Sequence, residues 1–433
     1  MNTKTETVLS EGKDIYRSSR LCVIIEAALE YFVALLTGGA FLAKVSTSIG
    51  ISDSLTGIIS SFVSLGCAVQ LFSLFMGGIK RVKWLVIPVT LFTQMFLCLI
   101  YVIPIVPIPA HIKPVAFVAC VLTANILLQL VGSPKLNWFM SLVDDKKRGV
   151  FTANKEIVSL IGGMIFTTVM GNIVDRYEAA GNLSGAFILC GVTIVVLMVL
   201  QSVTIILTRE KPIASCEKHA NPFANIKTLA KNKFYLMAVG ASILWSITNG
   251  CSVPFFGTYQ IRELGFSLTF VAILGIVYAI VRALVSRFWG RFADKHSFAR
   301  MMCFCISIAG AGYFINVFTS PANGKIFYTA YYVLTAIAMA GINSALTNLV
   351  LDYAPYALRT EALALSHTVY GLAGFFTTLA VSPLVTYIQN NGNRFLGLPL
   401  YAQQVVSAMA VLFCAALVLF LWLGFMRHAP KKD

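Results

Sequence analysis

Long apolar runs separated by short polar turns make up almost the whole chain. Each run has roughly 20 residues, the length that crosses a hydrocarbon core of about 30 Å at 1.5 Å per residue. The pattern therefore predicts an all-α membrane protein with twelve membrane-spanning helices, at 21–43, 54–76, 84–106, 114–143, 150–172, 184–207, 234–259, 268–288, 298–318, 326–350, 361–387 and 400–425. An even number of spans places both termini on one side. The first run is too long, and lacks the cleavage site, for a signal peptide, so we expect a permanent helix.

The longest polar stretch lies midway along the chain and divides it into two halves of six spans. It predicts five segments: a tail at 1–20, a six-helix bundle at 21–207, a linker at 208–233, a second six-helix bundle at 234–425 and a tail at 426–433. An offset of 211 places Arg148 on Arg359, Gly163 on Gly374 and Asn137 on Asn348. These coincidences at one offset predict a duplicated unit, and so two pseudo-symmetric bundles.

Composition agrees with a membrane protein and excludes a water-soluble domain. Hydrophobic residues make up 58% of the 433 residues and charged residues 12%, with a mean hydropathy of +0.80. The net charge of +15 could indicate a nucleic-acid partner. However, most Lys and Arg residues lie on the side of the termini, and the opposite loops hold only Lys44, Lys113, Arg176, Arg262, Lys325 and Arg394. This bias predicts cytoplasmic termini in the cell membrane and no nucleic-acid partner.

Enzyme signatures do not appear in the sequence. The cysteines lie almost entirely within apolar spans and form no CxxC pair. Phosphate-binding loops and HExxH or GxSxG motifs are also missing, and five scattered histidines form no cluster. We therefore expect neither an enzyme, nor a cofactor, nor a metal site. We do not expect a sensor either, because no loop is long enough to form a folded output domain.

The turn after the eighth expected span reads GRFADKHSFAR, from Gly290 to Arg300. This stretch resembles the G-x-x-x-D-[RK]-x-x-x-[RK] loop signature of the major facilitator superfamily, with Gly290, Asp294, Lys295 and Arg300 at the matching places. The resemblance implies a secondary transporter that works by alternating access, and it implies a gating role for these four residues. The equivalent turn of the first half, GGIKRVK, has no acidic residue.

Two subfamily signatures are missing. The fifth span, SLIGGMIFTTVMG, lacks the proline of the drug-antiporter signature, and the fourth span has Lys135 where an Arg would stand in many antiporters. The signatures of the main sugar-porter subfamily are absent as well. We therefore expect import over efflux, without a specific subfamily.

Charged residues inside the spans are costly in lipid and each one calls for a role. Counted along the helices, five of them share the cytoplasmic half: Glu26, Lys135, Lys155, Glu156 and Arg282. Such a layer predicts a salt-bridge gate on that side. Glu30 lies one turn deeper, and the sequence shows no obvious partner at its depth.

A buried carboxylate disfavours its charged form and so makes a usable proton carrier. Glu30 is therefore the predicted coupling residue. Glu26 lies on the same helix face, four residues away, so the two carboxylates could instead share a sodium ion. A third alternative is a structural pairing of Glu30 with His367 or a lysine.

Amide and aromatic side chains populate the middle of the spans, and the family resemblance implies that spans one, four, seven and ten line the cavity. The candidate substrate-binding residues are Asn125, Gln129, Trp245, Asn249, Asn343, His367 and Tyr370. Aromatic faces and amides suit a neutral sugar, whose C–H face stacks while its hydroxyls accept and donate hydrogen bonds. We thus expect a monomer that imports a small polar solute, a sugar or glycoside, with a proton or sodium ion. The alternative is proton-driven efflux of amphipathic compounds.

Overall fold

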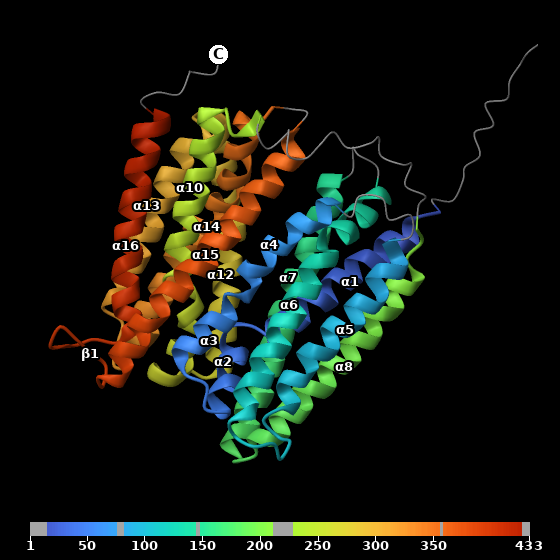
Figure 1. Ribbon diagram of the computed structural model, residues 1–433, viewed down its shortest axis with the longest axis vertical. Coiled ribbons are helices and arrows are strands. Elements are labelled where there is room, and N and C mark those ends of the chain that lie inside the picture. Colours follow the sequence, from blue (N-terminus) through green and yellow to red (C-terminus); the bar gives the residue numbers. More distant parts are fainter. Residues whose placement is uncertain (1–14, 76–81, 144–147, 211–227, 356–357, 427–433) are drawn as a thin grey trace, which may run out of the picture.

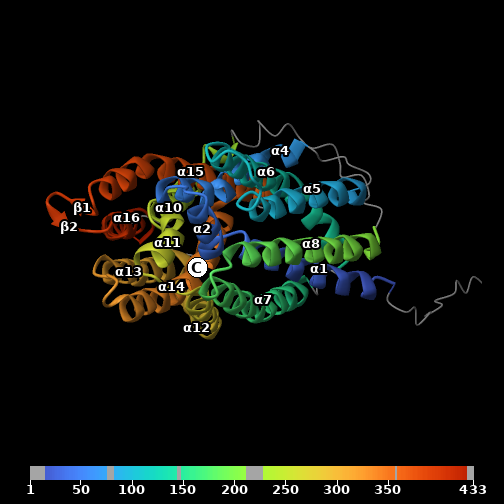
Figure 2. The same ribbon diagram turned by 90° about the horizontal axis from the view of Figure 1, so that it is seen from below.

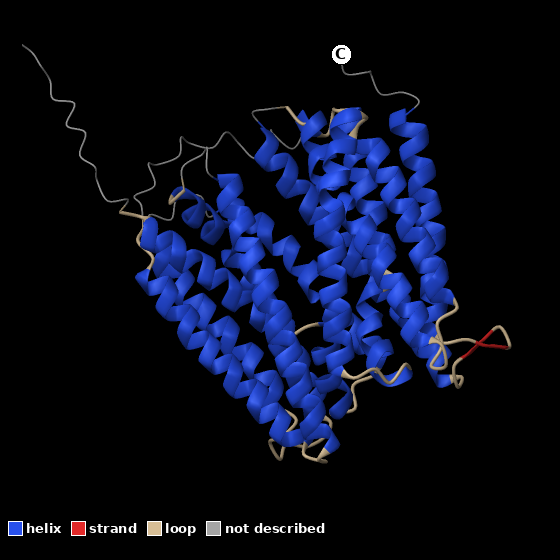
Figure 3. Cartoon of the chain, turned by 180° about the vertical axis from the view of Figure 1, so that it is seen from behind, coloured by secondary structure: helices blue, strands red, loops and turns tan. Residues whose placement is uncertain are grey.

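The computed structural model describes residues 15–75, 82–143, 148–210, 228–355 and 358–426 (Figure 1). Almost all of the described chain is helical (Figure 3). The first half contains α1 (Arg17–Leu36), α2 (Gly39–Ser48), α3 (Asp53–Ser60), α4 (Phe62–Phe75), α5 (Val82–Val102), α6 (Ile112–Ser141), α7 (Arg148–Ala179) and α8 (Leu183–Leu207). The second half contains α10 (Lys233–Gly250), the short helical turns η2 (Val253–Phe255), α11 (Phe256–Thr258) and η3 (Tyr259–Glu263), then α12 (Leu268–Lys295), α13 (Phe298–Val317), α14 (Gly324–Tyr353), α15 (Arg359–Asn390), α16 (Ala402–Leu421) and η5 (Trp422–Met426).

Ten helices in the described chain are long and apolar enough to cross a membrane, and an eleventh span is counted if α1 and α2 form one bent span. The break between α1 and α2 bends the path by 41°. It falls at two glycines, and Gly39 adopts a φ of +52°, which a residue with a Cβ rarely takes. The second expected span, 54–76, is divided at Ser61 into α3 and α4.

The helix lengths agree with the duplicated unit predicted from the sequence. Helices α7 and α15 each have 32 residues and begin at the aligned Arg148 and Arg359. Helices α6 and α14 each have 30 residues. Helices α3 and α12 both begin after a serine, Ser52 or Ser267, whose hydroxyl accepts a hydrogen bond from the third backbone N–H of the helix.

The two halves form two helical bundles, each with its own hydrophobic core. One core draws only on residues between Leu229 and Phe425, whereas two others join helices of the first half. Figures 1 and 2 show the bundles side by side, with α7 beside α12 and α4 beside α15. We call the side on which α1 begins and η5 ends the terminal side, at the top of Figure 1. The bundles lie closest together toward the opposite side.

Two local features differ from the sequence expectation. The connection before α16 contains a short hairpin, β1 (Arg394–Phe395) paired with β2 (Leu398–Pro399). Its turn residues, Leu396 and Gly397, both have positive φ, as a tight two-residue turn requires. In addition, α12 continues to Lys295, so most of the GRFADKHSFAR stretch is helical and the turn itself is short.

Candidate functional site

A buried ion triad lies in the first bundle, where α1 faces α6. The Lys135 Nζ atom is 2.5 Å from Glu26 Oε1 and 2.6 Å from Glu30 Oε2. The ammonium group is also 5.8 Å from the centre of the Phe139 ring, a cation–π distance. Glu30 therefore has a lysine partner, as one of the alternatives from the sequence allows, although the sequence shows no obvious partner at its own depth. Depth counted along separate helices does not allow for the long, flexible stem of a lysine, which reaches a neighbour at another level.

Burial differs sharply among the three members of the triad. The Glu26 side chain is 1% exposed, the Lys135 side chain 10% and the Glu30 side chain 31%. Two buried amides extend the network behind Glu26, because Gln201 Nε2 donates to Glu26 Oε1 at 2.9 Å and Gln94 Nε2 donates to Gln201 Oε1 at 2.8 Å. Glu26 is thus held from two sides, whereas Glu30 is the member that solvent can reach.

The triad is short of one positive charge when both carboxylates are ionised. A single lysine faces two glutamates, so the group carries one net negative charge in a largely buried site. Burial of unpaired charge costs several kcal/mol. One added proton would neutralise the triad, and Glu30 is its most exposed member.

A cavity of about 240 Å³ lies within the second bundle. Its walls come from α10, α14 and α15, and the lining residues are Ser242, Asn343, Leu346, Thr347, Val350, Leu363, Ser366, His367 and Tyr370. Three of the predicted substrate-binding residues, Asn343, His367 and Tyr370, are therefore brought together. The lining offers hydroxyl, amide and imidazole groups beside leucine and valine, and it contains no carboxylate, lysine or arginine.

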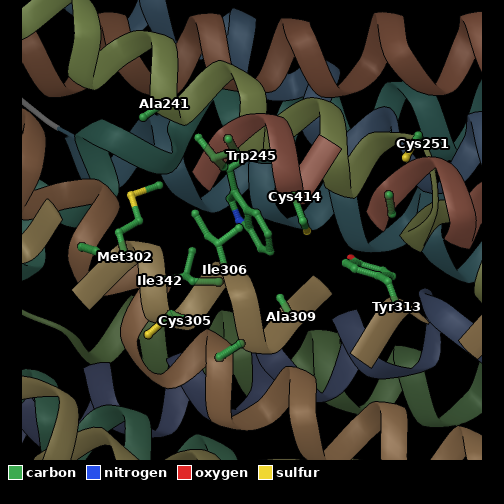
Figure 4. Packing of buried hydrophobic residues seen from close by; sticks show 14 of the residues in the cluster. Ala241, Trp245, Cys251, Met302, Cys305, Ile306, Ala309, Tyr313, Ile342 and Cys414 are labelled. Atoms are coloured by element: carbon green, nitrogen blue, oxygen red, sulfur yellow. The ribbon is translucent and has the colours of Figure 1, made fainter. Parts of the chain in front are cut away.

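Trp245 lies elsewhere than the sequence analysis expects. It is 2% exposed and belongs to the hydrophobic core of the second bundle. Figure 4 shows its ring among Met302, Ile306 and Ile342. The depth of Trp245 is central, but the rotation of α10 turns the indole away from the cavity, which Ser242 of the same helix lines.

The other predicted amide side chains form hydrogen bonds within their own helices or pack against a neighbouring helix. Asn125 and Asn249 each donate to the carbonyl four residues earlier, on Val121 and Trp245. The Gln129 stem packs against Gly66 of α4, where an added Cβ would come within 2.7 Å of it. The structure does not bring these three residues into the cavity of the second bundle.

The remaining predicted gate residues are spread along the terminal side. Lys155 and Arg282 are half-buried and Glu156 is exposed, and none of the three forms an ion pair with a described residue. Two members of the predicted layer, Glu26 and Lys135, do pair with each other, within the triad. Gly290 and Lys295 lie in the last turns of α12 and Arg300 in the first turn of α13. The Asp294 side chain lies outside the described residues.

Two contacts between the bundles, on the opposite side, were missed by the sequence analysis. The first centres on Asp53, a fully buried residue at the start of α3. Arg262 of η3 reaches Asp53 Oδ1 at 2.6 Å, and Gln389 Nε2 of α15 donates to Asp53 Oδ2 at 2.6 Å. The Ser54 and Ser382 hydroxyls meet beside it at 2.6 Å.

The second contact joins the end of α7 to the start of α12. Asp175 accepts hydrogen bonds from the backbone N–H of Leu268 at 3.0 Å and of Thr269 at 2.8 Å, and from the Thr269 hydroxyl at 2.6 Å. A carboxylate at a helix N-terminus satisfies free N–H groups and complements the helix dipole. Together with the Asp53 contact, it holds the two bundles closed on the opposite side.

Part of this arrangement has a sequence signal. A serine followed by an acidic residue at the start of an apolar span, as at Ser52 and Asp53, is a helix N-terminus pattern. The partners, however, are distant in sequence, with 209 positions between Arg262 and Asp53. Among the described residues, no group of His, Cys, Asp and Glu could hold a metal ion.

Solved structures of transporters share this fold. A point mutant of the nucleoside transporter NupG superimposes with a TM-score of 0.75 at 12% identity, covering 94% of this chain and 100% of that one. A bacterial homologue of the human lysosomal transporter Spinster gives 0.67 at 14% identity, with 95% and 97% coverage. The D-xylose-proton symporter gives 0.64 at 15% identity, with 92% and 96% coverage.

Comparison of the sequence with curated proteins finds no match. A family model does match, under the description Major Facilitator Superfamily, across residues 24–378. This match covers most of the chain and agrees with the two-bundle fold. The chain is a multi-pass membrane transporter and not an enzyme, and it belongs to the major facilitator superfamily.

Proposed function

We propose that the protein is a proton-coupled symporter that imports a small neutral solute, a sugar or glycoside, across the cell membrane. The basic loops favour cytoplasmic termini. With the opposite side held closed by Asp53 and Asp175, the structure then corresponds to a state that faces the cytoplasm. Alternating access requires that those contacts break and that the terminal side closes in turn.

The observation that carries the proposal is the triad of Glu26, Lys135 and Glu30. One lysine shared by a buried and a partly exposed carboxylate leaves a net negative charge that one added proton would neutralise. Glu30 is the exposed member, so we assign proton uptake and release to it. Glu26 keeps Lys135 paired when Glu30 becomes neutral, which avoids an unpaired buried cation.

The same geometry favours a proton over sodium. A sodium ion shared by Glu26 and Glu30 would lie between their oxygens, where the Lys135 ammonium lies at 2.5 and 2.6 Å. The metal would have to displace the lysine and leave it unpaired in a buried site. A proton needs no such displacement.

The choice of solute rests on the chemistry of the cavity in the second bundle. Its lining offers neutral hydrogen-bonding groups and apolar side chains, which suit a hydroxylated solute with an apolar face. An anion would call for a cation in the lining. The structural neighbours do not select a substrate, since one fold hosts many functions and their titles include nucleoside, xylose, peptide and metal transport.

The test is solute transport by Glu30→Gln in proteoliposomes, with proton and sodium gradients imposed separately. Glutamine keeps the size of glutamate and mimics its protonated form. We expect uphill accumulation to be lost and exchange of labelled for unlabelled solute to persist, because exchange needs alternating access but no net proton release. In the wild type, a proton gradient alone should drive uptake.

Asp352→Asn is the matched control, because it also replaces a carboxylate by an amide, at an exposed position outside the triad. It should retain proton-driven uptake. Full accumulation by Glu30→Gln would remove the coupling role from Glu30. Wild-type uptake that depends on sodium at constant pH would show that sodium, and not the proton, is the coupling ion.

A further inference from the structure

The connection between α15 and α16 exposes two leucines on the opposite side. Leu396, in the turn of the β1–β2 hairpin, is 86% exposed, more than any other large apolar side chain of the described chain, and Leu398 of β2 is 59% exposed. Exposed leucines on the spans face the hydrocarbon of the bilayer, whereas this pair lies beyond the helix ends. The pair therefore calls for an apolar environment that the chain itself does not provide.

The backbone of the turn makes leucine an unfavourable residue at position 396. Leu396 and Gly397 have φ values of +51° and +81°. This combination belongs to a two-residue turn in which Asn-Gly or Asp-Gly is favoured. A Cβ disfavours the left-handed conformation, and leucine has no polar group that could form a compensating local hydrogen bond. Leucine here strains the backbone and exposes an apolar side chain, and contact with an apolar environment would offset both costs.

The base of the hairpin is fixed to the second bundle. The Asn393 N–H donates to the Ile388 carbonyl at 3.0 Å, and the Leu400 N–H donates to the Asn393 carbonyl at 3.0 Å. Phe395 of β1 packs against the hydrophobic core of the second bundle. The two exposed leucines are therefore held away from the bundle by a firmly attached base.

The hairpin leaves the bundle sideways. Figures 1, 2 and 3 show it projecting from the ends of α15 and α16, on the side turned away from the first bundle. A segment that projects sideways at the ends of membrane-spanning helices lies over the surrounding lipid. Tyr387, in the last turn of α15, is 59% exposed, as expected of an aromatic residue where hydrocarbon meets headgroups. The hairpin thus lies at the level of the membrane interface.

We propose that the β1–β2 hairpin is an interfacial anchor that inserts Leu396 and Leu398 into the lipid leaflet on the opposite side. Arg394 of β1 is exposed and belongs to none of the ion pairs between described residues, so its guanidinium is available to lipid phosphates. The sideways position selects lipid over a protein partner, because lipid surrounds this edge of the bundle. The inference goes beyond the proposed function and requires neither the solute nor the coupling ion.

The experiment compares quenching of an added tryptophan in the full-length protein, reconstituted into lipid nanodiscs. Leu396→Trp is measured with ordinary lipids and with lipids brominated near the top of the acyl chains, and the wild-type signal is subtracted. We expect the added indole to lose about half of its fluorescence in brominated lipid, because interfacial segments bury apolar side chains roughly 5–10 Å deep, within reach of the bromines. Iodide, a quencher confined to water, should change this fluorescence little.

Ala180→Trp is the matched control, because it adds an indole at an exposed position on the same side, in the turn between α7 and α8. Its fluorescence should be quenched by iodide and spared by brominated lipid. Leu398→Trp provides a second hairpin variant if Leu396→Trp folds poorly, since position 398 has no positive φ. It should behave as Leu396→Trp does.

Three outcomes would overturn the proposal. Quenching of the hairpin indoles by iodide alone would place the hairpin in water. Protection from both quenchers would mean that a protein surface, such as a second copy of this chain, covers the leucines. Equal quenching of Ala180→Trp and the hairpin variants by brominated lipid would mean that any exposed indole on this side reaches the lipid.

Discussion

Lys135 is the residue on which the integrity of the triad depends. Among the described residues, it is the one cation that pairs with both carboxylates, and the side chain of one of them, Glu26, is 1% exposed. Lysine in such a place acts as a point charge whose loss leaves Glu26 buried with only Gln201 to hydrogen-bond it. The triad is therefore a structural element as well as the proposed coupling site.

We expect Lys135→Met to lower the free energy of unfolding by about 3–5 kcal/mol, because it strands a buried charge. The double variant Lys135→Met with Glu26→Gln should recover most of that loss, since it removes the stranded charge. Thermal unfolding of the detergent-purified variants provides the measurement. Lys155→Met is the control and should change stability little; equal losses in the single and double variants would contradict the pairing.

Trp245 illustrates how a residue at the right depth can have a different role. Because it is packed in the core of the second bundle, Trp245→Ala should cost about 3–5 kcal/mol of stability by leaving a cavity. Glycoside affinity per folded molecule should stay near the wild-type value. Trp422→Ala, at a position 51% exposed, should change neither quantity much. A large loss of glycoside affinity in well-folded Trp245→Ala would mean that the indole contributes to the binding site.

At the scale of elements, helix ends hold the bundles together. Asp175 sits at the end of α7 and binds the first N–H groups of α12, while Asp53 sits at the start of α3 and binds α15 and η3. Helices α7 and α15 are the two copies of one repeat unit, as are α3 and α12. The opposite side is thus closed by two related contacts. Asp175 joins α7 to α12, and Asp53 joins α3 to α15.

Asp175→Asn should loosen that closure, because the amide replaces a charge that interacts with a helix N-terminus. Charge-assisted hydrogen bonds contribute about 1.5–3 kcal/mol each, so a shift of population toward the opposite-open state is expected. The probe is Ala43→Cys, a fully buried position beside Gly257 of the other bundle. A membrane-impermeant maleimide applied from the opposite side should label it several-fold faster in the Asp175→Asn background.

Asp352→Asn, at an exposed position on the terminal side, is the control for this measurement. It should leave the labelling rate of Ala43→Cys unchanged. An unchanged rate in the Asp175→Asn protein, with normal folding, would mean that the α7–α12 contact does not hold the closure.

At the scale of the whole molecule, the polar contacts described between the bundles lie on the opposite side. They include the inter-bundle ion pair and the Asp175 contact. Leu160 of α7 and Ala279 of α12 line a cavity of about 280 Å³ between the two bundles. Toward the terminal side, Glu156 lies one turn from Leu160, and Arg282 lies three residues from Ala279. Since α7 and α12 run side by side in opposite directions, the two charges lie toward the same end of this helix pair.

We expect Glu156 and Arg282 to approach each other when the terminal side closes. A Glu156→Cys and Arg282→Cys double variant should form a disulfide under mild oxidation, and transport should stop until a reductant restores it. Pairing Glu156→Cys with Ser286→Cys, one turn farther along α12, tests whether the approach is specific to Arg282. Oxidation that leaves transport unchanged would rule out this closure.

The sequence alone determined the features that depend on local patterns. Apolar run length predicts the spans, loop charge predicts their orientation, and the repeat at an offset of 211 predicts two related bundles. It also singled out Glu26, Glu30 and Lys135 as charges that lipid would not tolerate unpaired.

Only the tertiary structure decided which of these residues meet. Glu30 and Lys135 are 105 positions apart and pair because α1 packs across α6, not because of any shared sequence pattern. The rotation of α10 sends Trp245 into the core while Ser242 faces the cavity. Hydropathy indicates only how deep a residue lies along its own helix. Helix rotation, helix tilt and contacts with distant helices depend on the packing of the whole chain, and they determine which residues face a cavity.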